Sequence, residues 1–397
     1  MPTPPTLLVL ATYFKGERFM LQAHARGARV YLLTVEKLLG EKWPREALTD
    51  VFALSHRNKL EETVRAVSYL ARSIKFDSIV PMDDFDVETA AALREHFRLP
   101  GMGDSGARFF RDKLAMRQCA KESGVRVPEF TGVFHHDDVR RFTARVPPPW
   151  MNKPRSQAGA TGITKVTSEE QLWRLVDQQG DAQSFHLLEQ YLPGDVFHVD
   201  SLVVGGKVVF ALAHRCGAPP FDVAHGGGIF STVTLDRDSE QAVRLRESNE
   251  QVIGALGLQY GAAHTEFILG RHDQEFYFLE SGARVGGAHI AECIEAASGI
   301  NPWGEWANLE VDRDNYRLPS VNKDYAGLVI SLSKHERPDW SAYQDPEIVY
   351  RAPEANHAGL IVKSSDRGRI EALVADYKER FARDFTAVLP AAKELEH

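Results

Sequence analysis

Apolar and polar residues form two kinds of pattern along the first hundred residues: short apolar runs and longer amphipathic stretches. The short runs predict buried strands at 6–12, 29–34, 51–54 and 77–82, and the longer stretches predict helices at 19–26, 60–74 and 87–97. Strands that alternate with helices of this length indicate a parallel α/β sheet whose two faces are covered. We expect this first unit to close near residues 99–103, where proline and glycine gather.

After residue 103 the pattern changes to helices mixed with strands that follow one another directly. Helices are predicted at 107–123, 137–143, 168–178, 240–256, 288–297 and 370–385, and strands at 129–134, 196–204, 207–213, 326–331 and 359–363. The turn Gly205-Gly206 joins two of these strands into a hairpin. The loop 216–228, rich in glycine and proline, is too long to serve only as a connector. An α+β region is therefore predicted after the first unit.

A second hairpin is predicted by two apolar runs, 263–269 and 275–279, that flank a short polar loop. If its turn is symmetric about Asp273, Leu269 lies opposite Tyr277 on the neighbouring strand. The same symmetry places Arg271 opposite Glu275.

The same register places Glu266 opposite Glu280. Opposite residues have Cβ atoms about 5 Å apart, and like charges there destabilise a sheet. A pair of carboxylates placed in this way needs a cation, and ligands of this all-oxygen kind suit Mg²⁺. Arg284, in the glycine-rich turn after the second strand, could then grip an anion beside the metal. Two solvated glutamates on an exposed face remain the alternative, because a one-residue bulge would break the pairing.

Composition narrows the class of protein. A chain of 397 residues with 43% apolar residues can form two or three domains, and a net charge of −8 with a pI near 6.0 argues against nucleic acid as the main partner. The three cysteines (Cys119, Cys216 and Cys293) form no CxxC pair, which fits a reducing compartment and gives no zinc site. With no membrane-spanning run and no signal-peptide pattern, we expect a cytoplasmic protein. Residues 395–397 look like a purification-tag remnant.

Two more segments carry candidate chemistry. Asp83, Asp84 and Asp86 follow a strand, where ligands often meet open sheets, but we favour helix capping as their role. The small-residue loop 155–163 could surround phosphate oxygens with its backbone N–H groups, although ordinary hairpins also use such residues. No GxGxxG motif follows the first strand, so dinucleotide binding has no support.

Taken in chain order, these motifs resemble the ATP-grasp superfamily over roughly residues 1–310. The motifs are a lysine on a helix, a lysine before a glycine loop, a hinge glutamate and a metal-binding hairpin. The resemblance is to the carboxylate–amine ligase branch, which includes the L-amino-acid ligases, and to the biotin-carboxylase-like members. It implies an α/β N-terminal (pre-ATP-grasp, Rossmann-like) domain at 1–105, α+β ATP-grasp lobes at 106–310 with a lid subdomain at about 125–185, and a small C-terminal α+β region at 311–394.

The resemblance also implies a ligand and a role for individual residues. It implies ATP and two Mg²⁺ ions, with Mn²⁺ as an alternative metal, held between two lobes. Catalytic roles fall to Arg284 and Lys153, and metal ligation to Glu266 and Glu280. The implied nucleotide-binding residues are Lys113, Lys153, Ser156, Gly159, Gly162, Glu189, Gln190, Tyr191, Leu192 and Asp195. The implied substrate contacts are Arg215, His264, Gly227 and Gly286.

Two positions depart from the family pattern. The family's metal motif usually has an asparagine two residues after the second glutamate, where this chain has Gly282. The glutamate that commonly holds the ribose falls at Val196, beside Asp195. These departures leave open how the second metal and the ribose are held. For the lone histidines His225 and His289 we favour a packed or surface role.

We therefore expect an ATP-dependent carboxylate–amine ligase that forms an amide through an acyl phosphate and releases ADP and phosphate. Its partners would be a small-molecule carboxylate and an amine, with no nucleic acid and no membrane, and a homodimer is left open. Three alternatives stay open: a biotin-carboxylase-like enzyme that activates bicarbonate, a carrier-protein aminoacyl loader, and a catalytically silent nucleotide-binding regulator.

Overall fold

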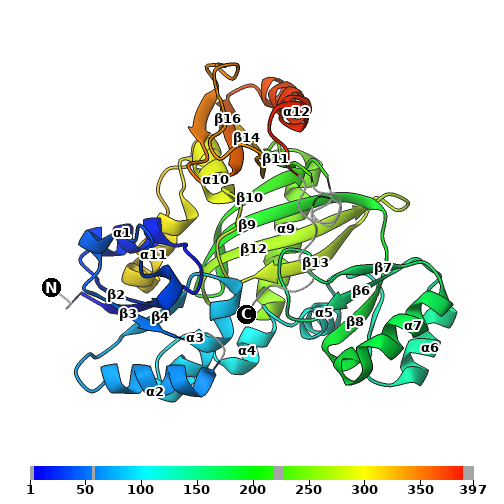
Figure 1. Ribbon diagram of the computed structural model, residues 1–397, viewed down its shortest axis with the longest axis horizontal. Coiled ribbons are helices and arrows are strands. Elements are labelled where there is room, and N and C mark those ends of the chain that lie inside the picture. The colour runs from blue at the N-terminus through cyan, green and yellow to red at the C-terminus, as the bar shows by residue number, and fades with distance from the viewer. Residues whose placement is uncertain (1–3, 56–58, 219–222, 224–227, 388–397) are drawn as a thin grey trace.

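The computed structural model describes residues 4–55, 59–218, 223 and 228–387, so the proposed tag remnant at 395–397 lies outside the described residues. The fold is a mixed α/β fold with three sheets, whose strand orders are β3-β2-β1-β4, β13-β12-β9-β10-β11-β14-β16-β15 and β5-β8-β6-β7 (Figure 1). No helix in this described part of the chain combines the length and apolarity needed to cross a lipid bilayer.

The first sheet is parallel, as its alternation of strands and helices predicts. Its strands are β1 (Thr6–Leu10), β2 (Arg29–Val35), β3 (Asp50–Leu54) and β4 (Ser78–Pro81), and its helices are α1 (Glu17–Ala25), α2 (Leu60–Leu70) and α3 (Asp84–Phe97). Successive residues of β1 belong to two different cores, Leu7 and Val9 packing with α1, and Leu8 and Leu10 with α2 and α3. Both faces of the sheet are therefore covered.

A small antiparallel sheet with two helices forms a separate lobe. It contains β5 (Phe130–Gly132), β6 (Trp150–Pro154), β7 (Thr164–Val166) and β8 (His186–Gln190), with α6 (His136–Arg145) and α7 (Glu169–Gln179). Trp150, Phe142 and Leu172 join sheet and helices in one core. We call this lobe, residues 130–190, the lid.

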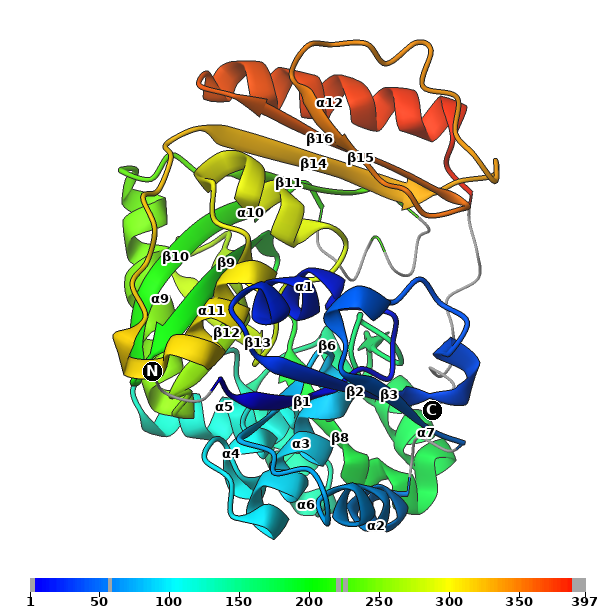
Figure 2. The ribbon, with the colours of Figure 1, turned by 90° about the vertical axis from the view of Figure 1, so that its left-hand side faces the viewer.

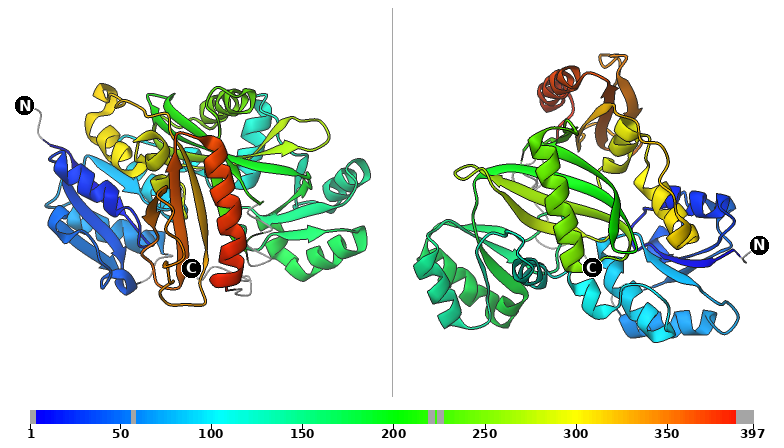
Figure 3. Two further views of the ribbon diagram at one scale, coloured as in Figure 1. Left: turned by 90° about the horizontal axis from the view of Figure 1, so that it is seen from above. Right: turned by 180° about the vertical axis from the view of Figure 1, so that it is seen from behind.

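The large sheet is antiparallel and extends from the middle of the molecule to its top in the view of Figure 1. Its strands are β9 (Gly194–Val204), β10 (Lys207–Cys216), β11 (Phe230–Thr234), β12 (Tyr260–Gly270), β13 (Phe276–Gly282), β14 (Tyr325–Leu332), β15 (Ile348–Arg351) and β16 (His357–Ser364). Helix α9 (Glu240–Leu256) packs on the back of the sheet against β9, β10 and β13 (Figure 3), and α12 (Arg367–Asp384) packs on β14 and β16 (Figure 2). Pairing of β11 with β14 makes the C-terminal strands part of the same sheet.

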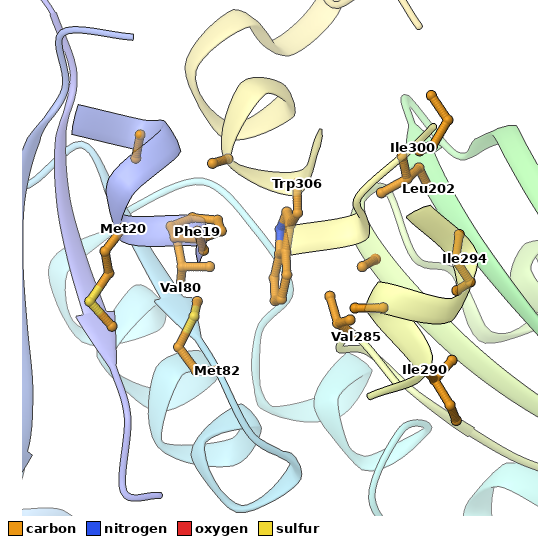
Figure 4. Packing of buried hydrophobic residues seen from close by; sticks show 14 of the residues in the cluster. Phe19, Met20, Val80, Met82, Leu202, Val285, Ile290, Ile294, Ile300 and Trp306 are labelled. Atoms are coloured by element: carbon orange, nitrogen blue, oxygen red, sulfur yellow. The ribbon is translucent and has the colours of Figure 1, made fainter. Parts of the chain in front are cut away.

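Two further helices join the parallel sheet to the large one. These are α10 (Ile290–Ser298) and α11 (Pro302–Asp312), the latter begun by the Asn301 side chain, which accepts hydrogen bonds from two backbone N–H groups. Figure 4 shows the Trp306 ring between Phe19 and Met82 on one side and Val285 on the other. This apolar contact fixes the position of the N-terminal unit against the large sheet.

The prediction of one helix at 107–123 is wrong. The chain forms two helices there, α4 (Asp104–Arg108) and α5 (Lys113–Glu122). Asp112 separates them, because its side chain accepts hydrogen bonds from the N–H groups of Leu114 and Ala115 and so begins a new helix. Six elements were not predicted at all (β6, β7, β8, β11, β15 and α11), and the five strands among them have only three to five residues.

Candidate active site

The two glutamates predicted as metal ligands face each other across β12 and β13. Phe267 pairs with Phe278 and Glu266 pairs with Glu280, so Leu279 is an extra residue on β13 and the ladder has a bulge at this point. Directly opposite residues share a face of the sheet, which places both carboxylates on one side. The pairing predicted from the sequence is present.

The predicted turn register, in contrast, is wrong. Leu269 pairs with Phe276 and not with Tyr277, so the turn is not symmetric about Asp273. The bulge then shifts the ladder by one residue and brings the two glutamates opposite each other. A bulge had been expected to break this pairing, but here it creates it.

A cavity of about 350 Å³ lies between the lid and the β12–β13 hairpin. Many of the residues assigned by the resemblance line it together: Lys113, Lys153, Gly159, Glu189, Gln190, Tyr191, Leu192, His264, Glu266, Glu280 and Arg284. Its apolar wall comes from Met151, Val196, Ile268 and Leu279. One side of the cavity is thus charged and the other apolar.

On the lid side, Glu189 holds two cations. Arg117 Nε donates to its Oε2 over 2.8 Å, Lys153 pairs with its Oε1, and Arg117 and Glu189 are almost fully buried. Burial alone would raise the pKa of Glu189, but Arg117 and Lys153 outweigh it and the pKa is lowered. The Glu189 carboxylate therefore holds Lys153 in position at the cavity wall.

Arg117 was missed by the sequence reasoning, although a signal existed. It lies four residues after Lys113 on α5, and residues at this spacing occupy the same face of a helix. A second basic residue on the face that carries Lys113 pointed to a carboxylate partner. Which carboxylate it meets depends on how α5 and β8 pack, and the sequence does not show that.

Lys113 connects the lid loop to the hairpin. Its Nζ lies 2.9 Å from Glu280 Oε2 and donates a 2.7 Å hydrogen bond to the backbone oxygen of Gln157. Burial would raise the pKa of Glu280, whereas Lys113 lowers it, and the lowering is larger. A cation accordingly already accompanies one of the two facing glutamates.

Arg284 is bound by an aspartate from the N-terminal unit. Asp84 Oδ2 accepts from Arg284 Nε at 2.9 Å and from Nη2 at 2.7 Å. Burial would raise the pKa of Asp84, but Arg284, followed by Arg111 and Lys15, lowers it to about 2. Capping, the role favoured from the sequence, holds for Asp83, which accepts from the Phe85 N–H. The Asp84 side chain instead binds Arg284 in the site, and the Asp86 carboxylate accepts hydrogen bonds from the N–H and hydroxyl groups of Thr12, so neither is the cap of α3.

His264 lines the cavity and is held from behind. Its Nδ1 lies 2.8 Å from Asp200 Oδ1, and its Nε2 lies 3.6 Å from Glu266 Oε1. Burial would lower the pKa of His264, yet Asp200 raises it to about 9, so the ring carries a positive charge at neutral pH. The other oxygen of Asp200 accepts from His198 Nδ1 at 2.6 Å.

Asp200 and His198 were also missed. His264 and Asp200 are cross-strand partners in the β12–β9 ladder, and a two-residue period puts His198 on the same face as Asp200. Within the described residues this trio forms the group of side chains whose ligand atoms lie close enough to hold a metal. Both short contacts are hydrogen-bond distances to one carboxylate, which favours a hydrogen-bonded chain.

Several predicted residues lie elsewhere. Asp195 and Arg215 pair with each other over 2.7 Å, both about half exposed, at a neighbouring cavity of about 280 Å³. Ser156 and Gly162 do not line the main cavity, and the backbone oxygen of Ser156 accepts from Arg111. Gly286 packs on Asp200, since a Cβ there would lie 2.8 Å from Oδ1. Gly227 and His225 lie outside the described residues.

No family model matches the chain. It is 26% identical over 246 residues to the L-arginine-specific L-amino acid ligase of Bacillus subtilis, a match that covers 60% of this chain and 59% of that ligase. It is 23% identical over 222 residues to the D-alanine–D-alanine ligase of Ralstonia nicotianae, covering 54% of this chain and 67% of that protein. The chain spans just over half the length of the first of these relatives.

Among solved structures, an L-amino acid ligase from Bacillus licheniformis has a similar fold along nearly the whole chain. The TM-score is 0.76 at 17% identity, and the match covers 97% of this chain and 98% of that one. The resemblance to the ATP-grasp superfamily, predicted from the motifs, is confirmed.

Proposed function

We propose that this chain, with its ATP-grasp fold, is an ATP-dependent carboxylate–amine ligase that joins an amino acid to a second amine. One observation carries the proposal: two lysines, two facing glutamates and Arg284 meet in a single cavity that also has an apolar wall. The named activities of the L-amino acid ligase and D-alanine–D-alanine ligase relatives support an amino acid as the acid that is activated. Nothing in the described residues favours bicarbonate, a carrier thiol or a silent regulator instead.

The residues of the cavity fit ATP and magnesium. Met151, Ile268 and Leu279 offer apolar surface for a flat base, and the backbone of Gln190 to Leu192 lies beside them to bond its edge. Lys113 and Lys153 can bind phosphate oxygens, and Glu266 and Glu280 are oxygen ligands of the kind Mg²⁺ takes. Magnesium would offset the charge of the transferring phosphoryl group, and Mn²⁺ could replace it.

The reaction proposed has two steps. An oxygen of the substrate carboxylate attacks the γ-phosphorus of ATP, and ADP leaves as the acyl phosphate forms. The nitrogen of the amine then attacks the acyl carbon, loses a proton, and phosphate leaves with both electrons of the broken C–O bond. Negative charge therefore stays close to one place through both steps.

Two fixed cations are positioned for that charge. Arg284 is oriented by Asp84, and His264 is oriented by Asp200, so each side chain is held before substrate arrives. Groups held in place in this way need no rearrangement when charge develops, which is where electrostatic stabilisation is strongest. We assign Arg284 to the γ-phosphate and the acyl phosphate, and His264 to the substrate carboxylate.

We further propose the domain limits implied by the resemblance: a pre-ATP-grasp domain at 1–105, ATP-grasp lobes at 106–310 with the lid subdomain at about 125–185, and a C-terminal region at 311–394. The β11–β14 ladder supports treating the C-terminal region as an extension of the ATP-grasp lobe. All three cysteines are free, which supports a reducing, cytoplasmic location. A homodimer stays a prediction.

Phosphate release tests the function. The protein is incubated with ATP, Mg²⁺ and each amino acid, alone and in pairs. Phosphate release is measured, and the masses of the products are determined by mass spectrometry. We expect phosphate release that requires particular amino acids, with a product whose mass equals both substrates less one water. Glu280→Gln is the matched control and should release almost none. Phosphate release with bicarbonate alone, or only with a thiol-bearing carrier protein, would contradict the amide ligase.

A further inference from the structure

Gly282 stands where the resemblance leads us to expect an asparagine ligand of the second metal. The space that such a side chain would fill is taken by another oxygen. A Cβ built on Gly282 would lie 2.9 Å from Asp84 Oδ1. An asparagine carries its amide oxygen roughly 2.4 Å from its own Cβ by ordinary bond lengths. Asp84 Oδ1 therefore lies at a distance from this Cβ similar to that of the missing ligand atom.

We propose that Asp84, from the N-terminal unit, supplies through Oδ1 the ligand of the second Mg²⁺ that Gly282 lacks. This inference rests on the proposed function, because it concerns the metal that would accompany ATP. It makes the N-terminal unit part of the catalytic site and not only its support. Glycine at 282 and aspartate at 84 then depend on each other, because a side chain at position 282 would collide with Asp84.

The environment of Asp84 suits a metal ligand. Its side chain is 9% exposed, and both hydrogen bonds from Arg284 fall on Oδ2, while Oδ1 faces Gly282. The Asp84 carboxylate thus has one oxygen, Oδ1, that is not bonded to Arg284. It can therefore hold Arg284 with one oxygen and a cation with the other, as carboxylates have lone pairs enough for both.

There is also space for an ion between Asp84 and the second glutamate. A cavity of about 20 Å³ is lined by Asp84, Glu280, Gly282, Lys113 and Arg284, among others. A volume of roughly 10–15 Å³ already holds one water molecule, so this one is large enough for a single ion. The carboxylates of Asp84 and Glu280 both border this cavity, and carboxylate oxygens are ligands of the kind that Mg²⁺ takes.

The rival explanation is that Asp84 only orients Arg284. The two explanations differ in how many metal ions the protein binds, which can be counted without turnover. Mn²⁺ is titrated into the full chain with a non-hydrolysable ATP analogue, and free Mn²⁺ is measured by electron paramagnetic resonance. We expect two bound ions in the parent and one in Asp84→Ala. Asp83→Ala removes the neighbouring buried carboxylate, which pairs with Lys15, and should keep two.

A relocation variant tests the position of the ligand. Asp84→Ala clears the space beside Gly282, whose backbone does not have a positive φ, so Gly282→Asn in that background should restore the second ion. If Asp84→Ala does not fold, Asp84→Glu keeps the charge beside Arg284 but displaces the oxygen, and the second Mn²⁺ should bind at least tenfold more weakly. Two ions bound to folded Asp84→Ala as tightly as to the parent would overturn the inference and leave the proposed function standing. A parent that binds no Mn²⁺ with nucleotide would overturn the proposed function as well.

Discussion

Replacing Arg117 with methionine should lower the free energy of unfolding of the lid by about 2–4 kcal/mol. Arg117 and Glu189 are 1% and 2% exposed, and removing one partner of a buried pair costs about 3–5 kcal/mol, because the other charge stays buried. Two features lower this figure. Lys153 still neutralises part of the Glu189 charge, and Arg117 Nη1 is buried without a hydrogen-bond partner among the described residues, so its removal is a gain.

The assay is urea unfolding followed by tryptophan fluorescence, to which Trp150, buried in the lid core, contributes. Adding Glu189→Gln to Arg117→Met removes the unpaired charge and should recover at least half of the loss. Arg174→Met, which breaks an exposed pair with Glu170 on α7, is the control and should change stability by less than about 0.5 kcal/mol. A cost under about 1 kcal/mol for Arg117→Met, or a double variant as unstable as the sum of both single ones, would refute the reasoning.

Three further predictions concern the metal, the lid loop and pH. Glu280→Gln should lower turnover by several orders of magnitude and leave the melting temperature within a few degrees, as steady-state kinetics and calorimetry would show. Hydrogen exchange in residues 154–163 should slow when a non-hydrolysable ATP analogue is added, because this loop becomes ordered when it closes over phosphate. Unchanged exchange at saturating nucleotide would count against closure of the loop. Burial would lower the pKa of His289, but bonds to Glu292 and Glu354 raise it to about 9. The charged His289 therefore adds at most about 3 kcal/mol to the free energy of unfolding. This contribution is fully present below pH 6.5 and is lost as the pH rises through 9. Asparagine suits the left-handed backbone at this position. In His289→Asn, the free energy of unfolding should therefore no longer show this fall when it is measured between pH 6 and 10.

The residues that could be predicted from the sequence are those set by local patterns. Lys113, Lys153, Glu266, Glu280 and Arg284 each belong to a short motif, and all five line one cavity. The alternation of strands and helices likewise gave the parallel sheet. The predicted pairing of the two glutamates is correct, but the turn register from which it was predicted is wrong. The bulge in β13 makes up for the difference.

The contacts that could not be predicted join residues far apart in the chain. Asp84 and Arg284 are separated by 200 positions, and Arg117 and Glu189 by 72. No periodicity in a single sequence carries information about such a contact, since it depends on how whole units pack. Asp84 was given a capping role together with Asp83 and Asp86, because all three follow the same strand and the sequence alone does not separate them. Strands such as β11 fail for another reason: three of its five residues are Ser or Thr, so no apolar run marks it.

Trapping the acyl phosphate tests the central claim most directly. Hydroxylamine attacks an acyl phosphate to give a hydroxamate, so parent protein with ATP, Mg²⁺ and the right amino acid should form the hydroxamate of that acid. Arg284→Lys keeps the charge but loses the planar fork that binds Asp84, and it should bind ATP within about tenfold of the parent while forming far less hydroxamate. Tight ATP binding by the parent with no hydroxamate from any amino acid would contradict the account.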